Sequence, residues 1–197
     1  MKHIKEVIVA TRNVGKFREF EQALRESNLR IYSLSDLGFV EDIEEDDTSY
    51  VMNALKKARK IGDRFNLPSL ADDSGLEVEY LKKRPGVKSA RYGRTDEERI
   101  QRLLLELADV PWERRSAKFK AYLALYLPGH ERQYIFYGEL KGYIGFEKKE
   151  KYGFGYDPIF YVPDIGKFLS ELSVEEKNEI SHRGKALKAL KKFLFGP

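Results

Sequence analysis

Two adjacent aspartates, Asp72 and Asp73, stand between short apolar runs in the stretch PSLADDSGLEVEY, residues 68–80. Apolar and acidic residues alternate after the pair, which predicts strand segments on both sides of a tight corner, with Gly75 free to adopt a positive φ. Such a corner would hold both carboxylates at the end of a sheet, where α/β proteins commonly bind ligands. The alternative is an ordinary polar turn, because turns also prefer Asp, Ser and Gly.

A second group of carboxylates forms the acidic run from Glu41 to Asp47, directly before a predicted helix. On its own, this run is typical of a solvated loop that favours the N-terminus of the following helix. Together with Asp73 it would instead suit Mg²⁺, which takes one or two carboxylates and several waters when it bridges a polyphosphate. Glu44 or Glu45 would then supply the second carboxylate.

The loop TRNVGK, residues 11–16, follows a predicted strand and opens a helix. Unpaired backbone N–H groups and the helix dipole attract anions at such a position. Thr11 would add a hydroxyl group and Lys16 a positive charge. The loop lacks the further glycines and the GK[ST] ending of a P-loop, so an ordinary strand-to-helix connection is the competing interpretation.

The segment KYGFGYDPIFYVP, residues 151–163, combines glycines with aromatic residues. Rings in such a segment either cover the core or are presented at a surface. In the second case Phe154 would stack on a purine, and Asp157 would accept hydrogen bonds from ring N–H groups.

A basic group stands beside a helix start in EEKNEISHRGKAL, residues 175–187. A single histidine at such a place is more often exposed or part of a helix cap than a ligand. Lys177, His182 and Arg183 together would, however, form a wall of hydrogen-bond donors.

The composition restricts the chemistry. The chain has 197 residues, enough for one domain with a sizeable core, and no cysteine, which excludes disulfides, thiolate catalysis and thiolate-bound metals. Oxygen ligands remain for a metal, and they suit Mg²⁺. No apolar run has the length of a membrane span or the form of a signal peptide, so we expect a cytoplasmic protein without a membrane partner. The net charge of +4 suits a polyanionic partner, either nucleic acid or a phosphate ester.

Apolar spacing and capping residues predict the elements that would position these groups. They are strands at 6–10 and 29–34, helices after residue 13 and at 49–65, a helix after the capping pair Thr95 and Glu98, a hairpin of 117–127 and 132–144, a helix after Ser173 and Glu176, and a last helix after Ser181. The order is neither strict βαβ nor wholly antiparallel, so the predicted class is α/β with a mixed sheet, in one domain. The hairpin, at about 115–145, is expected to build a second lobe.

As an ordered set, these motifs resemble the inosine triphosphate pyrophosphatase family. The segments that carry the resemblance, in the family's order and at its spacing, are TRNVGK, NALKKA, ADDSGLEV, PGVKSARY, GFGYDPIF and EEKNEISHRGKAL. The resemblance implies an elongated mixed β-sheet flanked by helices, with the nucleotide in a cleft between two lobes. It also implies a Mg²⁺-dependent homodimer that hydrolyses ITP, dITP and XTP to the monophosphate and pyrophosphate.

The resemblance further implies roles for individual residues. Asp73 would be the general base and, with Glu45, would bind the metal, while Asp72 would keep the local potential negative. The segment DDTSYVMNA departs from the family pattern, so Glu44 stays an alternative to Glu45. The residues that would bind the nucleotide are Thr11, Arg12, Asn13, Val14, Gly15, Lys16, Lys57, Ser74, Phe154, Gly155, Tyr156, Asp157, Lys177, His182 and Arg183.

Selection of the base would follow from the pattern of donors and acceptors. Arg183 can only donate, so a guanidinium aimed at position 6 would pair with the oxo group of hypoxanthine and face the amino group of adenine. Two alternatives remain open: a related pyrophosphatase for other modified nucleotides, and a nucleic-acid-binding module. The SHR segment argues against the first, and the uncharged run 121–127 of the hairpin argues against the second.

Overall fold

The computed structural model describes residues 4–41, 43, 49–130, 132–149 and 151–196. In this part of the chain, the strands are β1 (Glu6–Val9), β2 (Arg30–Ser33), β3 (Ser69–Val78), β4 (Arg84–Pro85), β5 (Ser116–Leu127), β6 (Arg132–Ile144), β7 (Phe160–Val162) and β8 (Lys167–Phe168). The α-helices are α1 (Val14–Leu24), α2 (Tyr50–Phe65), α3 (Asp96–Glu106), α4 (Val174–Ile180) and α5 (His182–Phe195). Short 3₁₀ turns connect several of them, including η1 (Gly86–Arg91).

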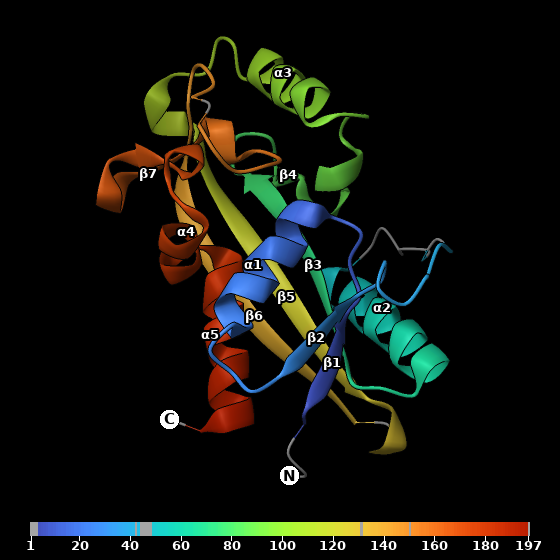
Figure 1. The fold of residues 1–197 in the computed structure, drawn as a ribbon. Helices are drawn as coiled ribbons and strands as arrows, with labels where there is room; N and C mark the ends of the chain where they lie inside the picture. Colours follow the sequence, from blue (N-terminus) through green and yellow to red (C-terminus); the bar gives the residue numbers. More distant parts are fainter. Residues whose placement is uncertain (1–3, 42, 44–48, 131, 150, 197) are drawn as a thin grey trace.

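The described strands form one mixed sheet in the order β2-β1-β3-β5-β6-β7-β8, with β4 beside β3. β1 pairs in parallel with β2 and β3, whereas the pairs from β3 to β8 are antiparallel. The predicted α/β class with a mixed sheet is therefore confirmed. Figure 1 shows the sheet as an elongated, twisted layer, with α3 at one end and both termini at the other.

β3 corrects the first prediction, because no corner interrupts it. All ten residues pair with β5, from Ser69 opposite Tyr126 to Val78 opposite Ala117. Gly75 is needed for close approach and not for a turn: an added Cβ would lie 2.3 Å from the carbonyl oxygen of Gly86. Pairing with a long neighbouring strand has overridden the local turn preference of the sequence DDSG.

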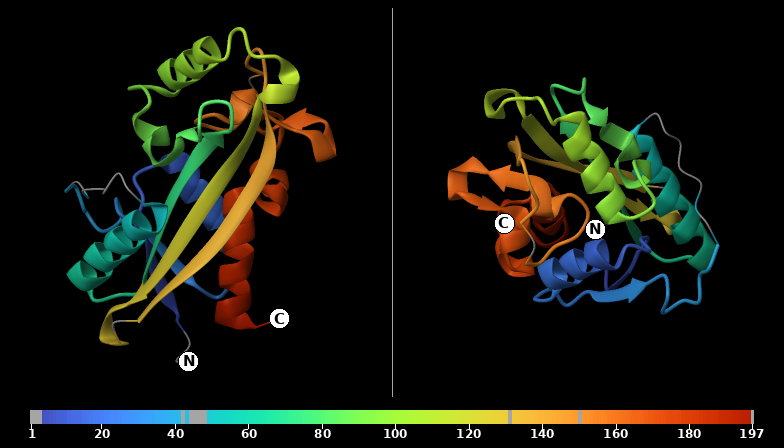
Figure 2. Two further views of the ribbon diagram at one scale, coloured as in Figure 1. Left: turned by 180° about the vertical axis from the view of Figure 1, so that it is seen from behind. Right: turned by 90° about the horizontal axis from the view of Figure 1, so that it is seen from above.

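Helices cover both faces of the sheet. On one face α1 and α5 contribute Phe20, Leu24, Leu187 and Leu190 to a core with Leu70 and Leu123 of the strands. On the other face α2 packs through Ala54, Ala58 and Ile61 onto Ala71 and Ala124. A third core lies under α3 and includes Leu76, Leu103, Phe119 and Phe160. The view from above in Figure 2 shows α2 and α5 on different sides of the sheet.

The hairpin of β5 and β6 runs through the length of the sheet. Phe119 of β5 belongs to the core under α3, whereas Leu123 and Ala124 belong to the cores on the two faces. The hairpin thus connects the α3 end of the molecule with the rest of it.

One edge of β3 is open in the middle. β1 ends at Val9, which lies opposite Leu70, and β4 begins only opposite Glu77. On this side, the stretch of β3 between Leu70 and Glu77 has no strand partner in the described chain, and it contains both aspartates. The loop that follows β1 leads to α1 beside this gap, as expected for the carboxyl end of a parallel strand.

Candidate active site

Four segments that are distant in the sequence converge at the gap beside β3. They line a small cavity of about 90 Å³. Predicted residues in its lining are Asn13, Lys16, Ser74, Phe154, Gly155, Tyr156, Asp157, Lys177, His182 and Arg183. The structure therefore brings together the predicted phosphate loop, the aspartate strand and both predicted base-binding segments.

Asp72 and Asp73 lie on opposite faces of the sheet, because successive residues of a strand alternate. Asp72 faces α1 and α5, where Lys16 Nζ lies 2.6 Å from its Oδ2. Asp73 faces α2, where Asn53 Nδ2 donates to its Oδ2 at 2.8 Å. The two carboxylates are thus not a like-charge pair in one site, which corrects the expectation that Asp72 keeps the potential negative next to Asp73.

Asp72 is paired with cations. Nη2 of Arg183 donates to its Oδ2 at 3.2 Å, and Ser74 Oγ donates to the same oxygen at 3.0 Å. Burial alone would raise the pKa of Asp72, but the charges of Arg183 and Lys16 outweigh burial and hold the pKa far below its ordinary value. Asp72 is consequently ionised and serves to hold Lys16 and Arg183.

Glu19 extends these contacts to the base-binding segments. It accepts from Nη1 of Arg183, and its Oε1 lies 2.6 Å from Nζ of Lys177. The same Nζ donates to Asp157 Oδ2 at 2.6 Å. The contacts therefore form a continuous series in which three cations alternate with three buried carboxylates. The order is Lys16, Asp72, Arg183, Glu19, Lys177 and Asp157. Burial would lower the pKa of Lys177, but Asp157 and Glu19 raise it above its ordinary value.

Phe154 lies in the wall of the cavity. Its ring lies over the start of α1, where an added Cβ on Gly15 would be 2.3 Å from Phe154 Cδ1. Lys177 Nζ is 4.4 Å from the ring centroid, a cation–π contact. Sites for small molecules usually have volumes of roughly 300–1,000 Å³, so the cavity is smaller than such sites with Phe154 in this position.

The loop that carries Phe154 is fixed from the α3 end of the molecule. The Gly155 N–H donates to Asp96 Oδ2 at 2.7 Å, and the Tyr156 hydroxyl donates to the carbonyl oxygen of Ser89 at 2.9 Å. Asp157 Oδ2 accepts from the Phe154 N–H at 2.9 Å. The loop thus joins α3 and η1 to the charged groups on α4 and α5.

His182 and Arg183 are both buried at the start of α5, whose N-cap is Ser181. The His182 ring stacks on Phe119 with centroids 4.7 Å apart. Burial, aided by the charges of Arg183 and Lys177, lowers the pKa of His182 well below its ordinary value, so the ring is neutral. Arg183 donates to Glu19, Asp72 and Ser74, so it is ordered without substrate. Its direct recognition of position 6 stays a prediction.

The start of α1 has the form expected of an anion-binding loop. Asn13 caps the helix by accepting from the Lys16 N–H at 2.9 Å, and Thr11 Oγ1 accepts from the Asn13 N–H at 3.2 Å. Val14 is exposed beside them. Arg12 donates to the carbonyl oxygen of Glu41.

On the α2 face of the sheet, the buried side chain of Lys57 contacts β3 at its open stretch. Its Nζ donates to the backbone oxygen of Asp72 at 2.9 Å and lies 3.7 Å from Asp73 Oδ1. The predicted metal ligands Glu45 and Glu44 lie outside the described residues, so Asp73 is the described member of that set.

The described residues supply some of the oxygen atoms that a Mg²⁺ site needs. Beside Asp73, the Tyr50 hydroxyl is a buried oxygen without a hydrogen-bond partner in the described chain. Oxygen atoms are the ligands that Mg²⁺ takes, directly or through its waters. Among the described residues no group of three carboxylate, histidine or cysteine side chains is placed to hold a metal.

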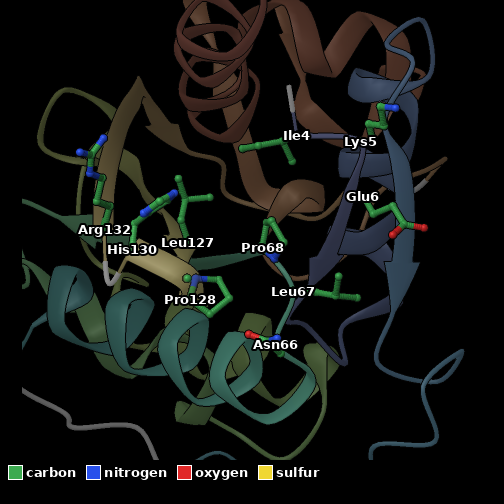
Figure 3. A pocket seen from close by; sticks show the side chains of 11 residues that line it. Ile4, Lys5, Glu6, Asn66, Leu67, Pro68, Leu127, Pro128, His130 and Arg132 are labelled. Atoms are coloured by element: carbon green, nitrogen blue, oxygen red, sulfur yellow. The ribbon is translucent and has the colours of Figure 1, made fainter. Parts of the chain in front are cut away.

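A larger cavity of about 550 Å³ lies at the other end of β1 (Figure 3). Leu67, Pro68, Leu127 and Pro128 form its apolar part, and its charged groups, such as Arg132, lie at its rim. None of the predicted site residues lines it. The site is therefore assigned to the gap at β3, where buried charged groups converge.

The family model described as the Ham1 family matches residues 7–193. The chain belongs to the Ham1 family. The resemblance found in the motifs is thus confirmed over nearly the whole chain. Among the described residues, no helix is both long and apolar enough to cross a membrane.

Two enzymes and a solved structure are similar to this chain over nearly their full length. A dITP/XTP pyrophosphatase of Halalkalibacterium halodurans is 48% identical, and the match covers 97% of this chain and 100% of that protein. The enzyme of the same name from Bacillus subtilis is 44% identical, with 97% and 98% covered. A solved HAM1 protein from Coxiella burnetii has a TM-score of 0.86 at 41% identity, covering 98% of this chain and 99% of that one.

Some residues of the site were not predicted from the sequence. Glu19 was missed, although it lies one helical turn after Lys16 and next to buried Phe20, where a charged side chain needs a partner. Asp96 was missed because it is the first residue of α3, and acidic residues are common at the start of a helix without having any further role. Asn53 gave no signal beyond its place in NALKKA.

Proposed function

We propose that this chain is a dITP/XTP pyrophosphatase that hydrolyses dITP, XTP and ITP to the monophosphate and pyrophosphate in the cytoplasm, where soluble nucleotides are found. The carrying observation is that the start of α1 lines one cavity together with Phe154 and Asp157, beside the open stretch of β3 that contains Asp73. Full-length relatives with this activity support the substrate class.

In this proposal the nucleotide straddles the open edge of β3. The base enters on the α1 and α5 face, in place of the Phe154 ring, which then stacks on it, and Lys177, His182 and Arg183 contact its edge. The phosphates pass the start of α1 and Lys57 toward Asp73. Asp73 takes a proton from water while the water oxygen bonds to phosphorus, and the phosphoanhydride bond between the α- and β-phosphates breaks, its electrons leaving with pyrophosphate.

Asp73 would hold Mg²⁺ together with a carboxylate from the acidic segment before α2, for which Glu45 was predicted. When bound, the ion neutralises charge that develops on the phosphates. Lys57, whose Nζ lies 3.7 Å from Asp73 Oδ1, would add positive charge on the same side of β3. The phosphates would also contact the predicted loop that opens α1, which consists of Thr11, Arg12, Asn13, Val14, Gly15 and Lys16.

The substrate assignment predicts a specific product pattern. With Mg²⁺, dITP, XTP and ITP should give the monophosphate and pyrophosphate at rates at least about 100-fold above those for ATP and GTP, since sites built on hydrogen bonds reject mismatched analogues strongly. Anion-exchange chromatography of the products measures this directly. Release of diphosphate and inorganic phosphate would contradict the proposal, and salt-sensitive oligonucleotide binding without hydrolysis would support the nucleic-acid alternative.

We further propose a homodimer through the face of β5 and β6 that α2 leaves uncovered. Ile135 and Tyr137 are 36% and 42% exposed there, and the left view of Figure 2 has no described helix in front of this part of the hairpin. Light scattering should give about twice the chain mass of 22.9 kDa. Ile135→Glu should yield monomers, whereas Leu105→Glu on exposed α3 should not. A monomeric wild type would rule the dimer out.

A further inference from the structure

Asn53 occupies an unusual position between α2 and β3. It lies one helical turn after Tyr50 and one turn before Lys57, on the side of α2 that faces β3, and its exposure is 1%. Its Nδ2 donates to Asp73 Oδ2 at 2.8 Å. No catalytic or binding role was assigned to it from the sequence.

The orientation of the Asn53 amide follows from chemistry. An ionised carboxylate only accepts hydrogen bonds, so the amide must turn its NH₂ group toward Asp73 and its oxygen away from that carboxylate. That oxygen, Oδ1, is buried and has no hydrogen-bond partner in the described chain. Native proteins leave few buried polar atoms without partners, and those few are often occupied by water or used in catalysis.

A carboxylate with a free hydrogen-bond acceptor beside it suits a water molecule that attacks phosphorus. It must give one proton to a base, hold the other in a hydrogen bond, and point a lone pair at the phosphorus atom. Asp73 supplies the base, and the hydrogen bond from Asn53 Nδ2 to Asp73 holds the Asn53 amide, with its acceptor Oδ1, beside that residue. Lys57, on the other side of Asp73, has no acceptor atom and cannot take this role.

We infer that Asn53 is a further catalytic residue, whose Oδ1 accepts a hydrogen bond from the attacking water while Asp73 takes the other proton. The inference rests on the proposed function. One water O–H bond breaks and its proton passes to Asp73, the water oxygen forms a bond to phosphorus, and the bond to the leaving pyrophosphate breaks with its electron pair. The proton held by Asn53 stays on the new phosphate group.

The test compares Asn53→Ala and the nearly isosteric Asn53→Leu with Met52→Ala, a control at the neighbouring, 57% exposed position of α2. Both Asn53 variants should lower kcat for dITP by about 100-fold or more, as expected for a lost contact to the reacting group. KM should change by less than about threefold, since substrate binding is retained. Met52→Ala should leave both constants unchanged.

Two binding measurements separate this role from others. Calorimetric titration with α,β-methylene dITP and electron paramagnetic resonance titration with Mn²⁺ should give dissociation constants within about threefold of wild type for both variants. A tenfold weaker Mn²⁺ affinity, or a kcat within threefold of wild type, would overturn the inference. Asn53→Leu keeps the test informative should Asn53→Ala fold poorly. A wild-type protein that does not hydrolyse dITP would refute the proposed function itself, before any variant is compared.

Discussion

Asp73→Asn is expected to lower kcat for dITP by about 10²–10⁴-fold, the usual contribution of a positioned acid–base group. Asparagine has the shape of aspartate, but it cannot take the proton from water and is a poorer metal ligand. The surrounding contacts should largely persist, because Asn53 Nδ2 can donate to the new amide oxygen. Loss of the charge near Lys57 should cost about 1–3 kcal/mol of unfolding free energy.

The measurement is a steady-state assay with separated products, accompanied by thermal unfolding to confirm the fold. Asp109→Asn, at an exposed position, is the matched control and should retain wild-type activity. If Asp73→Asn kept more than about a tenth of the wild-type rate, Asp73 would not be the general base.

The elements that were predicted correctly are those with strong local signals. In α1, Phe20 and Leu24 are buried as their helical spacing indicates, and Asn13 caps the helix. In α4, Ser173 and Glu176 form the predicted capping box. For α3, Thr95 accepts from the Glu98 N–H as expected, but the Glu98 side chain turns to Arg94. Local hydrogen bonds and periodicity suffice for such elements.

β3 shows where local signals fail. The sequence DDSG prefers a turn, but pairing with β5 along ten residues keeps the chain extended through Gly75. This single error also caused the wrong interpretation of the aspartate pair, since alternation along a continuous strand places Asp72 and Asp73 on opposite faces. The short strands β4, β7 and β8 have two or three residues each and depend on their neighbours in the sheet.

The site was predictable in its parts but not in its connections. The motifs supplied Lys16, Asp157, Lys177 and Arg183, and all four line the cavity. Glu19 connects Arg183 with Lys177, and Asp72 connects Lys16 with Arg183. These contacts exist only because α1, α4 and α5 pack together with β3. No local pattern encodes such an arrangement, since it depends on distances between helices far apart in the sequence.

Asp72→Asn is expected to have the largest effect on stability. Asp72 is fully buried, and its charge is matched by Lys16 and Arg183. Removing one partner from a buried ion pair costs about 3–5 kcal/mol, because the remaining charge loses its compensation. For a chain of this length, the loss corresponds to a fall in Tm of roughly 6–20 °C.

The pH dependence of this effect distinguishes charge from packing. The pKa of Asp72 is far below its ordinary value in the folded protein, so its charge stabilises the fold at every pH above the unfolded pKa of about 3.9. This stabilisation is lost as pH falls below about 4 and Asp72 becomes protonated first in the unfolded chain. The Tm difference between wild type and Asp72→Asn should therefore be constant from about pH 5 to 8 and shrink toward pH 2. Asp164→Asn, at an exposed position, should show no such difference. A Tm difference that is already small at pH 7, or that does not shrink in acid, would mean that the charge of Asp72 does not stabilise the fold.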